Sequence, residues 1–214
     1  MNFFSKKPAP PPELSLSFVE RILQSPHHMP VDEFSWLTEA YEAADVILEY
    51  GSGRSTLLAA EMRGKTLFSV ESDAAWVRQF QEHFDQVPPA SRILMHHVDI
   101  GETAKWGNPV DESGWRQYHQ YPLSIWDRSE FIAPDLIFID GRFRMACWVT
   151  AMLRITRPTV VLFDDYTNRP QYHEIEDFAK PVDTCGRIAR FELTPREFPV
   201  AEMTKIMEIY TKVA

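Results

Sequence analysis

Two glycines and two acids stand near one another in the sequence, in an arrangement that suits the binding of a nucleoside. The apolar residues 46–48 are followed by Glu49 and then by Gly51 and Gly53, and Glu71 ends the next apolar run. Because glycine has no Cβ atom, it lets the chain turn sharply and lets a ligand lie against the backbone. An acid at the carboxyl end of the following strand is placed to accept hydrogen bonds from ribose hydroxyl groups. This stretch therefore predicts a nucleoside-containing cofactor.

The residues around the turn distinguish between cofactors. A dinucleotide fingerprint requires G-x-G-x-x-G, whose third glycine allows close packing near a pyrophosphate. Thr56 stands at that third position, after Ser55, and Glu49 stands two residues before Gly51. A carboxylate there would repel a pyrophosphate but could receive a cationic amino group. A cofactor with an amino group is therefore favoured, and an NAD(P)-dependent oxidoreductase stays as an alternative.

Three further acids follow two later apolar runs. Asp140 comes directly after residues 136–139, and Asp164 and Asp165 come directly after residues 159–163. Because neighbouring parallel strands bring such residues close together, the acids could share a cation, and Mg²⁺ prefers carboxylate oxygens. The alternatives are that Asp164 caps a loop and that Asp165 pairs with Arg142.

Strands and helices alternate around these residues. Helices are expected over residues 15–24, 32–43 with Asp32 as N-cap, 55–63, 74–86, 141–154 and after Pro170, and strands over residues 46–48, 67–70, 92–98, 135–140, 159–163, 187–193 and 205–211. This alternation predicts an α/β fold with a doubly wound, seven-stranded and mostly parallel sheet, helices on both faces and a C-terminal antiparallel hairpin. Ligands of such sheets bind over the carboxyl ends of the strands.

The pattern E-x-G-x-G-x-S, followed by V-E, resembles the first two motifs of class I S-adenosylmethionine-dependent methyltransferases. The resemblance extends from Asp45 to the C-terminus. It implies that the first acid and the two glycines surround the amino-acid part of S-adenosylmethionine and that the second acid holds its ribose. Asp99 and Ile100, past the third strand, match the place of an acid that accepts the adenine amino group. The cofactor-binding residues implied are Glu49, Tyr50, Gly51, Ser52, Gly53, Ser55, Thr56, Glu71, Ser72, Asp99, Ile100 and Asp140.

The later acids resemble the metal site of catechol and caffeoyl-coenzyme A O-methyltransferases. In that family an acid and an Asp-Asn pair hold a metal that binds two neighbouring substrate oxygens. Asp140 and Asp164 match this pattern, whereas Asp165 stands where an Asn is expected. Arg142 and Arg144 stand where the family has a lysine base; arginine stays charged, but could bind a carboxylate or phosphate. The candidate bases are therefore Asp140 first, and then His119, Tyr166 and His173.

Several segments lie outside this pattern. Residues 1–12, which contain PAPPP, predict a flexible arm, and residues 13–214 a single domain with residues 13–44 forming helices ahead of the first strand. Residues 101–134 are rich in aromatic side chains without a clear period, and we expect a substrate-side insertion; packing on the sheet edge is the alternative. Trp76 would either stack on adenine or pack on the sheet. His27 and His28 are expected in a loop without a metal.

Composition narrows the class of protein. The chain has 214 residues, 44% of them apolar, which suits one α/β domain. A net charge of −9, with Lys6 and Lys7 as the only basic cluster, argues against nucleic acid as a partner. No apolar run approaches the roughly 18 residues of a membrane span, and the first residues lack the apolar core of a signal peptide. Cys147 and Cys185 do not make a disulfide framework, and we expect a cytoplasmic protein.

The sequence thus predicts a cytoplasmic S-adenosylmethionine-dependent methyltransferase with a small-molecule acceptor. An oxygen nucleophile with Mg²⁺ is the more specific hypothesis. A protein of the same fold that binds the cofactor without turnover is the main alternative. Neither nucleic acid nor a membrane is an expected partner, and the sequence leaves the oligomeric state open.

Overall fold

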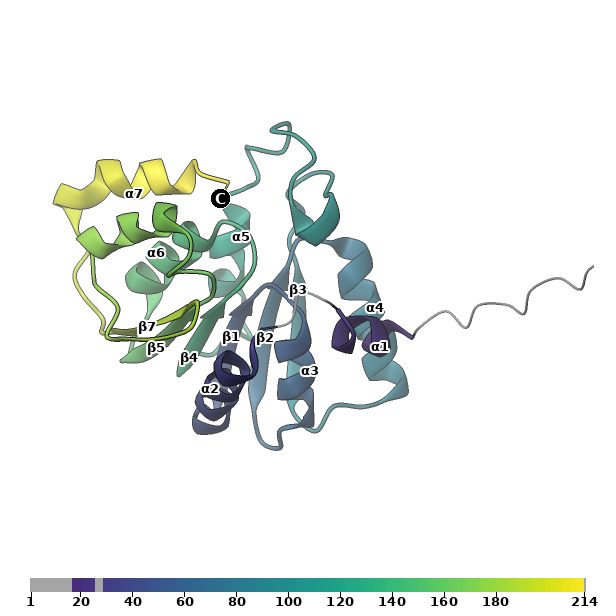
Figure 1. The fold of residues 1–214 in the computed structure, drawn as a ribbon. Coiled ribbons are helices and arrows are strands. Elements are labelled where there is room, and N and C mark those ends of the chain that lie inside the picture. Colours follow the sequence, from purple (N-terminus) through teal and green to yellow (C-terminus); the bar gives the residue numbers. More distant parts are fainter. Residues whose placement is uncertain (1–16, 26–28, 214) are drawn as a thin grey trace, which may run out of the picture.

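Five apolar strands form the parallel part of a seven-stranded sheet (Figure 1). The structure is a computed structural model, and it describes residues 17–25 and 29–213. Its strands are β1 (Val46–Tyr50), β2 (Thr66–Glu71), β3 (Arg92–His97), β4 (Leu136–Ile139), β5 (Thr159–Phe163), β6 (Asp183–Cys185) and β7 (Ile188–Leu193). They lie in the order β3-β2-β1-β4-β5-β7-β6, and β7 runs antiparallel to both of its neighbours. The predicted fold class is confirmed.

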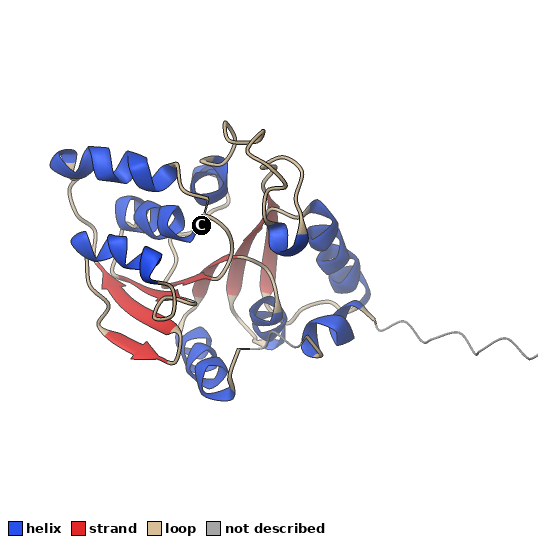
Figure 2. Ribbon diagram, turned by 45° about the horizontal axis from the view of Figure 1, so that its top comes forward, coloured by secondary structure: helices blue, strands red, loops and turns tan. Residues whose placement is uncertain are grey.

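Helices cover both faces of this sheet (Figure 2). They are α1 (Phe18–Leu23), α2 (Val31–Ala43), α3 (Arg54–Glu61), α4 (Ala74–Gln86), α5 (Gln120–Leu123), α6 (Arg144–Arg154) and α7 (Met203–Tyr210), with shorter 3₁₀ turns η1 (Lys105–Gly107), η2 (Ser124–Asp127), η3 (Pro170–Asp177) and η4 (Val200–Glu202). One apolar cluster joins α6, η3 and α7 to one face of the sheet, and another joins α2 and α3 to the other face. Because both faces are covered, the central strands β1, β2 and β4 are mostly apolar, and their buried polar residues are Glu49, Ser69 and Glu71.

Strand register places the functional candidates at one edge of the sheet. Tyr50 lies opposite both Val70 and Ile139, and Ile139 lies opposite Phe163. Gly51, Asp140 and Asp164 therefore directly follow β1, β4 and β5, and Glu71 is the last residue of β2. All four belong to the carboxyl ends of parallel strands, where α/β sheets bind ligands.

The C-terminal part of the chain differs from the prediction at one element. Residues 205–211 were expected to form a strand, but residues 205–210 lie in α7, whose buried residues are Ile206 and Ile209. A spacing of three suits one face of a helix that packs on α6, whereas a strand would bury alternate residues. The antiparallel hairpin is formed instead by β6 and β7, joined through Gly186.

Some helix starts also differ from the prediction. Pro30, rather than Asp32, is the N-cap of α2, and Asp32 lies in the first turn, where the helix dipole favours an acid. Helix α6 begins at Arg144 because Phe143 has a left-handed backbone, with φ 52°. The arm of residues 1–12 and the pair His27 and His28 lie outside the described residues, so these predictions stay untested.

Two further expectations concern the insertion and membranes. Residues 101–134 contain η1, α5 and η2 rather than one continuous loop. Over residues 17–25 and 29–213, no helix combines the length and the apolar character that crossing a bilayer requires. The cytoplasmic location and the domain limits stay predictions.

The turn after β1 depends on a close backbone approach. Gly51 has φ +96°, and a Cβ atom there would lie 2.6 Å from Gly141 Cα. Gly64 has a similar φ of +78° but no atom within 4 Å of such a Cβ. We predict that Gly64→Ala lowers the free energy of unfolding by about 1–2 kcal/mol, the cost of the left-handed backbone alone. Gly51→Ala should cost at least about 2 kcal/mol more, because the methyl group also overlaps backbone atoms.

Urea denaturation of both variants and the wild type measures this difference. Equal losses at the two positions would show that the contact between Gly51 and Gly141 does not constrain the turn.

Candidate functional site

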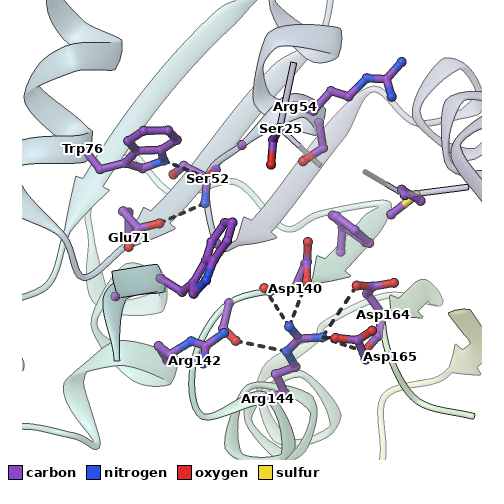
Figure 3. A pocket seen from close by; sticks show the side chains of 18 of the residues that line it. Ser25, Ser52, Arg54, Glu71, Trp76, Asp140, Arg142, Arg144, Asp164 and Asp165 are labelled. Carbon is purple, nitrogen blue, oxygen red and sulfur yellow. Dashed lines mark hydrogen bonds and ion pairs between the residues drawn. The ribbon is translucent and has the colours of Figure 1, made fainter. Parts of the chain in front are cut away.

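A cavity of about 880 Å³ opens over the carboxyl ends of the parallel strands. Its size is within the range of small-molecule sites. The glycine turn and Glu71 line one side, and the three aspartates with several arginines line the other (Figure 3). Residues of α1 and α2 and of the 101–134 insertion complete its wall. The insertion therefore contributes directly to the cavity.

Glu71 connects the end of β2 to the glycine turn. Its Oε2 accepts a hydrogen bond from Ser52 N at 3.1 Å, and its Oε1 accepts from Ser72 N at 2.7 Å and Asp73 N at 3.0 Å. Burial raises the pKa of Glu71, although these backbone donors act in the opposite direction. Each carboxylate oxygen has two lone pairs, so Oε2 can accept one further donor from a ligand.

Trp76 lies beside the same turn. Its Nε1 donates to Ser52 O at 2.9 Å, and its ring packs edge-on against Phe18 and Phe80. Trp76 also lines the cavity. The side chain therefore packs on aromatic rings of α1 and α4 and also faces the cavity, and its stacking on adenine stays a prediction.

Glu49 lies beneath the turn, with no exposed surface. Its carboxyl group accepts hydrogen bonds from four hydroxyl groups, those of Tyr41, Ser55, Thr56 and Ser69. Burial raises the pKa of Glu49 to about 7, against the lowering effect of these donors. Glu49 is not among the residues that line the cavity in the described chain, whereas Ser55, which donates to it, is.

Five other predicted cofactor residues, among them the buried Ser72, do not belong to the cavity lining within the described chain. Tyr50 is in the core, where its hydroxyl donates to Pro122 O and accepts from Trp126 Nε1. Ile100 is buried as well, and Asp99 is exposed, with its carboxylate accepting from Gly101 N at 2.9 Å. Within the described residues, neither these three nor Thr56 belongs to the cavity lining.

The insertion occupies the region next to the end of β2. Ser72 is buried, and its Oγ donates to Gly107 O at 3.1 Å. This contact brings Lys105, Trp106 and Asn108 to the cavity wall. The sequence predicted a substrate-side insertion, but it contained no signal that this segment would lie against Ser72.

The three aspartates lie together, as predicted, but arginines lie among them. One carboxylate oxygen from each of Asp140, Asp164 and Asp165 lies within 4.8 Å of the other two. Arg144 is only 3% exposed, and its guanidinium lies 2.9 Å from Asp140 Oδ1, 3.8 Å from Asp164 Oδ2 and 3.3 Å from Asp165 Oδ2. It also donates to three backbone carbonyl oxygens at this end of the sheet, those of Asp140, Gly141 and Asp164.

Two more arginines complete this network. Asp165 pairs with Arg169 at 2.6 Å and with Arg187 at 3.1 Å, and Arg187 also pairs with the buried Glu33 of α2. Asp165 therefore pairs with arginines other than Arg142, the partner that the sequence analysis considered. Burial and the two neighbouring carboxylates raise the pKa of Asp164 to about 8.

This arrangement does not fit a Mg²⁺ ion. Magnesium requires near-octahedral oxygen ligands, most of them anionic or water. Each of the three carboxylates already has a guanidinium within 4.0 Å, and Arg144 is fixed by backbone carbonyls. A metal ion would have to share these carboxylates with a buried cation that is hydrogen-bonded on several sides, although Asp164 Oδ1 has no hydrogen-bond partner in the described chain.

Among the candidate bases, Asp140 is the one that the cavity exposes. Its side chain is 41% exposed and lines the cavity. His119 is exposed elsewhere, Tyr166 donates to Glu176, and His173 bonds to Tyr166 O. Across the described ranges, none of these three lines the cavity.

The buried carboxyl of Glu49 should make stability depend on pH. Its folded-state pKa of about 7 lies above the reference value of 4.5, so its protonated form stabilises the fold. That contribution is complete below about pH 4.5 and is lost as pH rises through about 7, in total about 3 kcal/mol. We therefore predict that the wild type loses about 3 kcal/mol relative to Glu49→Gln between pH 4.5 and 8.

Denaturant titrations of both proteins across this pH range make the measurement. The glutamine can keep most of the contacts, because the neighbouring hydroxyl groups can accept as well as donate. Stability curves that run parallel across the range would contradict a raised pKa at Glu49.

Comparison with known proteins adds to this geometry. No protein-family model matches the sequence, and no curated protein matches it. Among solved structures, a methyltransferase-like protein from Silicibacter pomeroyi is 42% identical and has a TM-score of 0.82, over 86% of this chain and 96% of that chain.

More distant structures share the fold. The O-methyltransferase TomG from Streptomyces achromogenes, solved with S-adenosylmethionine, is 15% identical with a TM-score of 0.53, over 79% of this chain and 82% of that chain. An O-methyltransferase from Bacillus cereus, solved with S-adenosylhomocysteine, is 15% identical with a TM-score of 0.52, over 82% and 90%. The chain therefore belongs to the family of the methyltransferase-like protein from Silicibacter pomeroyi, and it shares its fold with the two O-methyltransferases.

Proposed function

We propose that this protein transfers a methyl group from S-adenosylmethionine to a small-molecule acceptor. The observation that carries the proposal is the single cavity that joins the glycine turn and Glu71 to the partly exposed Asp140. Family membership supports the reaction class, and the cofactors bound to TomG and to the Bacillus cereus enzyme support the donor. The net charge of −9 supports a small acceptor over nucleic acid.

The cofactor would lie along the carboxyl edge of β1 and β2. The free lone pair of Glu71 Oε2 is available to a ribose hydroxyl. The backbone of Gly51 to Gly53 and the hydroxyl of Ser55 would face the amino-acid part, with Glu49 acting through Ser55. Trp76 and the insertion around Trp106, rather than the exposed Asp99, offer apolar surface to the adenine.

Catalysis would consist mainly of positioning. The sulfonium of the cofactor is an activated methyl donor, so the protein has to align the acceptor and receive its proton. Asp140 is the carboxylate that an acceptor can reach, and Arg144 holds it in place at 2.9 Å. An acceptor whose proton is already acidic suits this site, because the chain has no lysine at the place of the family's base.

We further propose that the transfer proceeds without a divalent metal. Arg144 supplies positive charge among the three aspartates, at the place where the related O-methyltransferases would hold an ion. The same arginine network favours the second candidate function, a protein that binds the cofactor without turnover. Because the arginines pair with the aspartates, Asp140 is the one aspartate of the three left exposed to the cavity as a base.

Cofactor binding is the first test. We predict that S-adenosylhomocysteine binds the wild type and that Glu71→Ala weakens binding by about 10- to 100-fold, the loss of a hydrogen bond to a charged group. Asp99→Ala serves as the matched acid-to-alanine control and should bind like the wild type, since Asp99 is exposed outside the cavity lining.

Isothermal titration calorimetry gives the three dissociation constants, with circular dichroism to check that Glu71→Ala is folded. A folded wild type that does not bind S-adenosylhomocysteine would refute the proposed reaction. Loss of binding in Asp99→Ala alone would instead place the adenine at Asp99.

Metal independence has its own measurement. We predict that millimolar MgCl₂ and EDTA give the same melting temperature and the same affinity for S-adenosylhomocysteine, because a ligand that does not bind the native state cannot stabilise it. A rise in melting temperature with MgCl₂ in the wild type that Asp164→Ala abolishes would show that the aspartates do bind a metal.

A further inference from the structure

The arginine side chains near the three aspartates differ in their partners. Arg144, Arg169 and Arg187 each lie within 4.0 Å of one or more carboxylates. Arg142 lines the same cavity, and among the described residues no carboxylate lies within that distance of it. Arg142 is therefore the arginine beside the three aspartates that forms no ion pair within the described chain. Arg21 of α1 and Arg54 of α3 also line the cavity without a carboxylate within 4.0 Å, but they belong to other parts of its wall.

Arg142 is held in position by neutral groups. Its Nη1 donates to Asn108 Oδ1 at 2.7 Å, and Asn108 Nδ2 in turn donates to Lys105 O at 2.9 Å, which orients the amide. The backbone N–H of Arg142 donates to the Tyr121 hydroxyl, and its carbonyl accepts from Cys147 Sγ. The side chain is thus directed by one hydrogen bond, and most of its five donors are left for another partner.

The surroundings of Arg142 make its charged guanidinium energetically unfavourable when no anion is nearby. The residue is half-buried, and its Nε is buried with no hydrogen-bond partner in the described chain. Burial and the nearby guanidinium of Arg144 lower the pKa of Arg142. A desolvated guanidinium is unfavourable unless a charged partner or a set of hydrogen bonds compensates it. Its planar fork of donors matches a carboxylate or a phosphate.

We propose that Arg142 binds an anionic group, a carboxylate or a phosphate, of the methyl acceptor. The inference rests on the proposed function, since it assigns the acceptor class of the same site. Arg142 and Asp140 belong to the loop that follows β4, so one residue would hold the anion while the other faces the reacting atom. Lys105 adds a second cation to the same wall, through the insertion.

Model anions can test this assignment before the acceptor is known. Benzoate and phenyl phosphate are titrated into the complex with S-adenosylhomocysteine, with benzamide as the uncharged analogue. We predict that an anion binds the wild-type complex at least about tenfold more tightly than it binds Arg142→Gln, as loss of a bidentate pair implies. Benzamide should show no such difference. The preferred anion distinguishes a carboxylate acceptor from a phosphate acceptor.

Two further variants make the test specific. Arg190→Gln removes an arginine whose Nε is also buried without a partner, but which lies on β7 outside this cavity, so it should bind the anions like the wild type. Asn108→Asp places a carboxylate against Arg142 Nη1 and should weaken anion binding while Arg142 is still present. This second variant keeps the proposal testable if Arg142→Gln fails to fold.

The outcomes separate this inference from the proposed function. Equal anion affinity in the wild type, Arg142→Gln and Asn108→Asp, or no anion binding by the wild-type complex, overturns the inference and leaves the reaction class standing. Loss of S-adenosylhomocysteine affinity in Arg142→Gln also overturns it, because the guanidinium would then serve the carboxylate of the cofactor. A wild type that binds no S-adenosylhomocysteine refutes the proposed function itself.

Discussion

The buried guanidinium of Arg144 organises the side of the cavity that the three aspartates line. It joins the ends of β4 and β5 through three carboxylates and three backbone carbonyl oxygens. A buried cation of this kind is stable only with its partners in place, so the loops after both strands have little freedom to move independently. This constraint explains why Asp164 and Asp165 are buried although they follow a strand at a cavity, and why Asp140 is the aspartate left for a ligand.

Much of the fold could be predicted from local patterns. The central strands are short apolar runs, and the parallel register then brings Gly51, Glu71 and Asp140 to one edge without further information. Residues 205–211 were assigned wrongly because isolated apolar residues at a spacing of three are ambiguous in a short segment, and packing on α6 decides in favour of a helix. The N-cap of α2 was predicted at Asp32 rather than at Pro30, because in the sequence an acid in the first turn of a helix resembles an N-cap residue.

The site was less predictable, because its partners are distant in sequence. That acids would gather at the sheet edge follows from topology, but the pairing of Asp165 with Arg169 and Arg187 does not. The sequence also did not predict that the insertion lies against Ser72, or that Asp99 lies outside the cavity lining of the described chain; adenine binding at Asp99 stays a prediction. Glu49 was expected to meet the ligand directly, and the four hydroxyl groups around it come from three separate elements that only the folded chain brings together.

The contact between Glu33 and Arg187 has a consequence for the order in which the chain assembles. Arg187 N donates to Glu33 Oε1 at 2.8 Å, across 154 residues of sequence. During synthesis the N-terminal segment emerges first, and long-range contacts form late because the intervening loop must be closed. Glu33 therefore cannot gain this partner until β7 has been made, and we expect the contact between α2 and β7 to form late in folding.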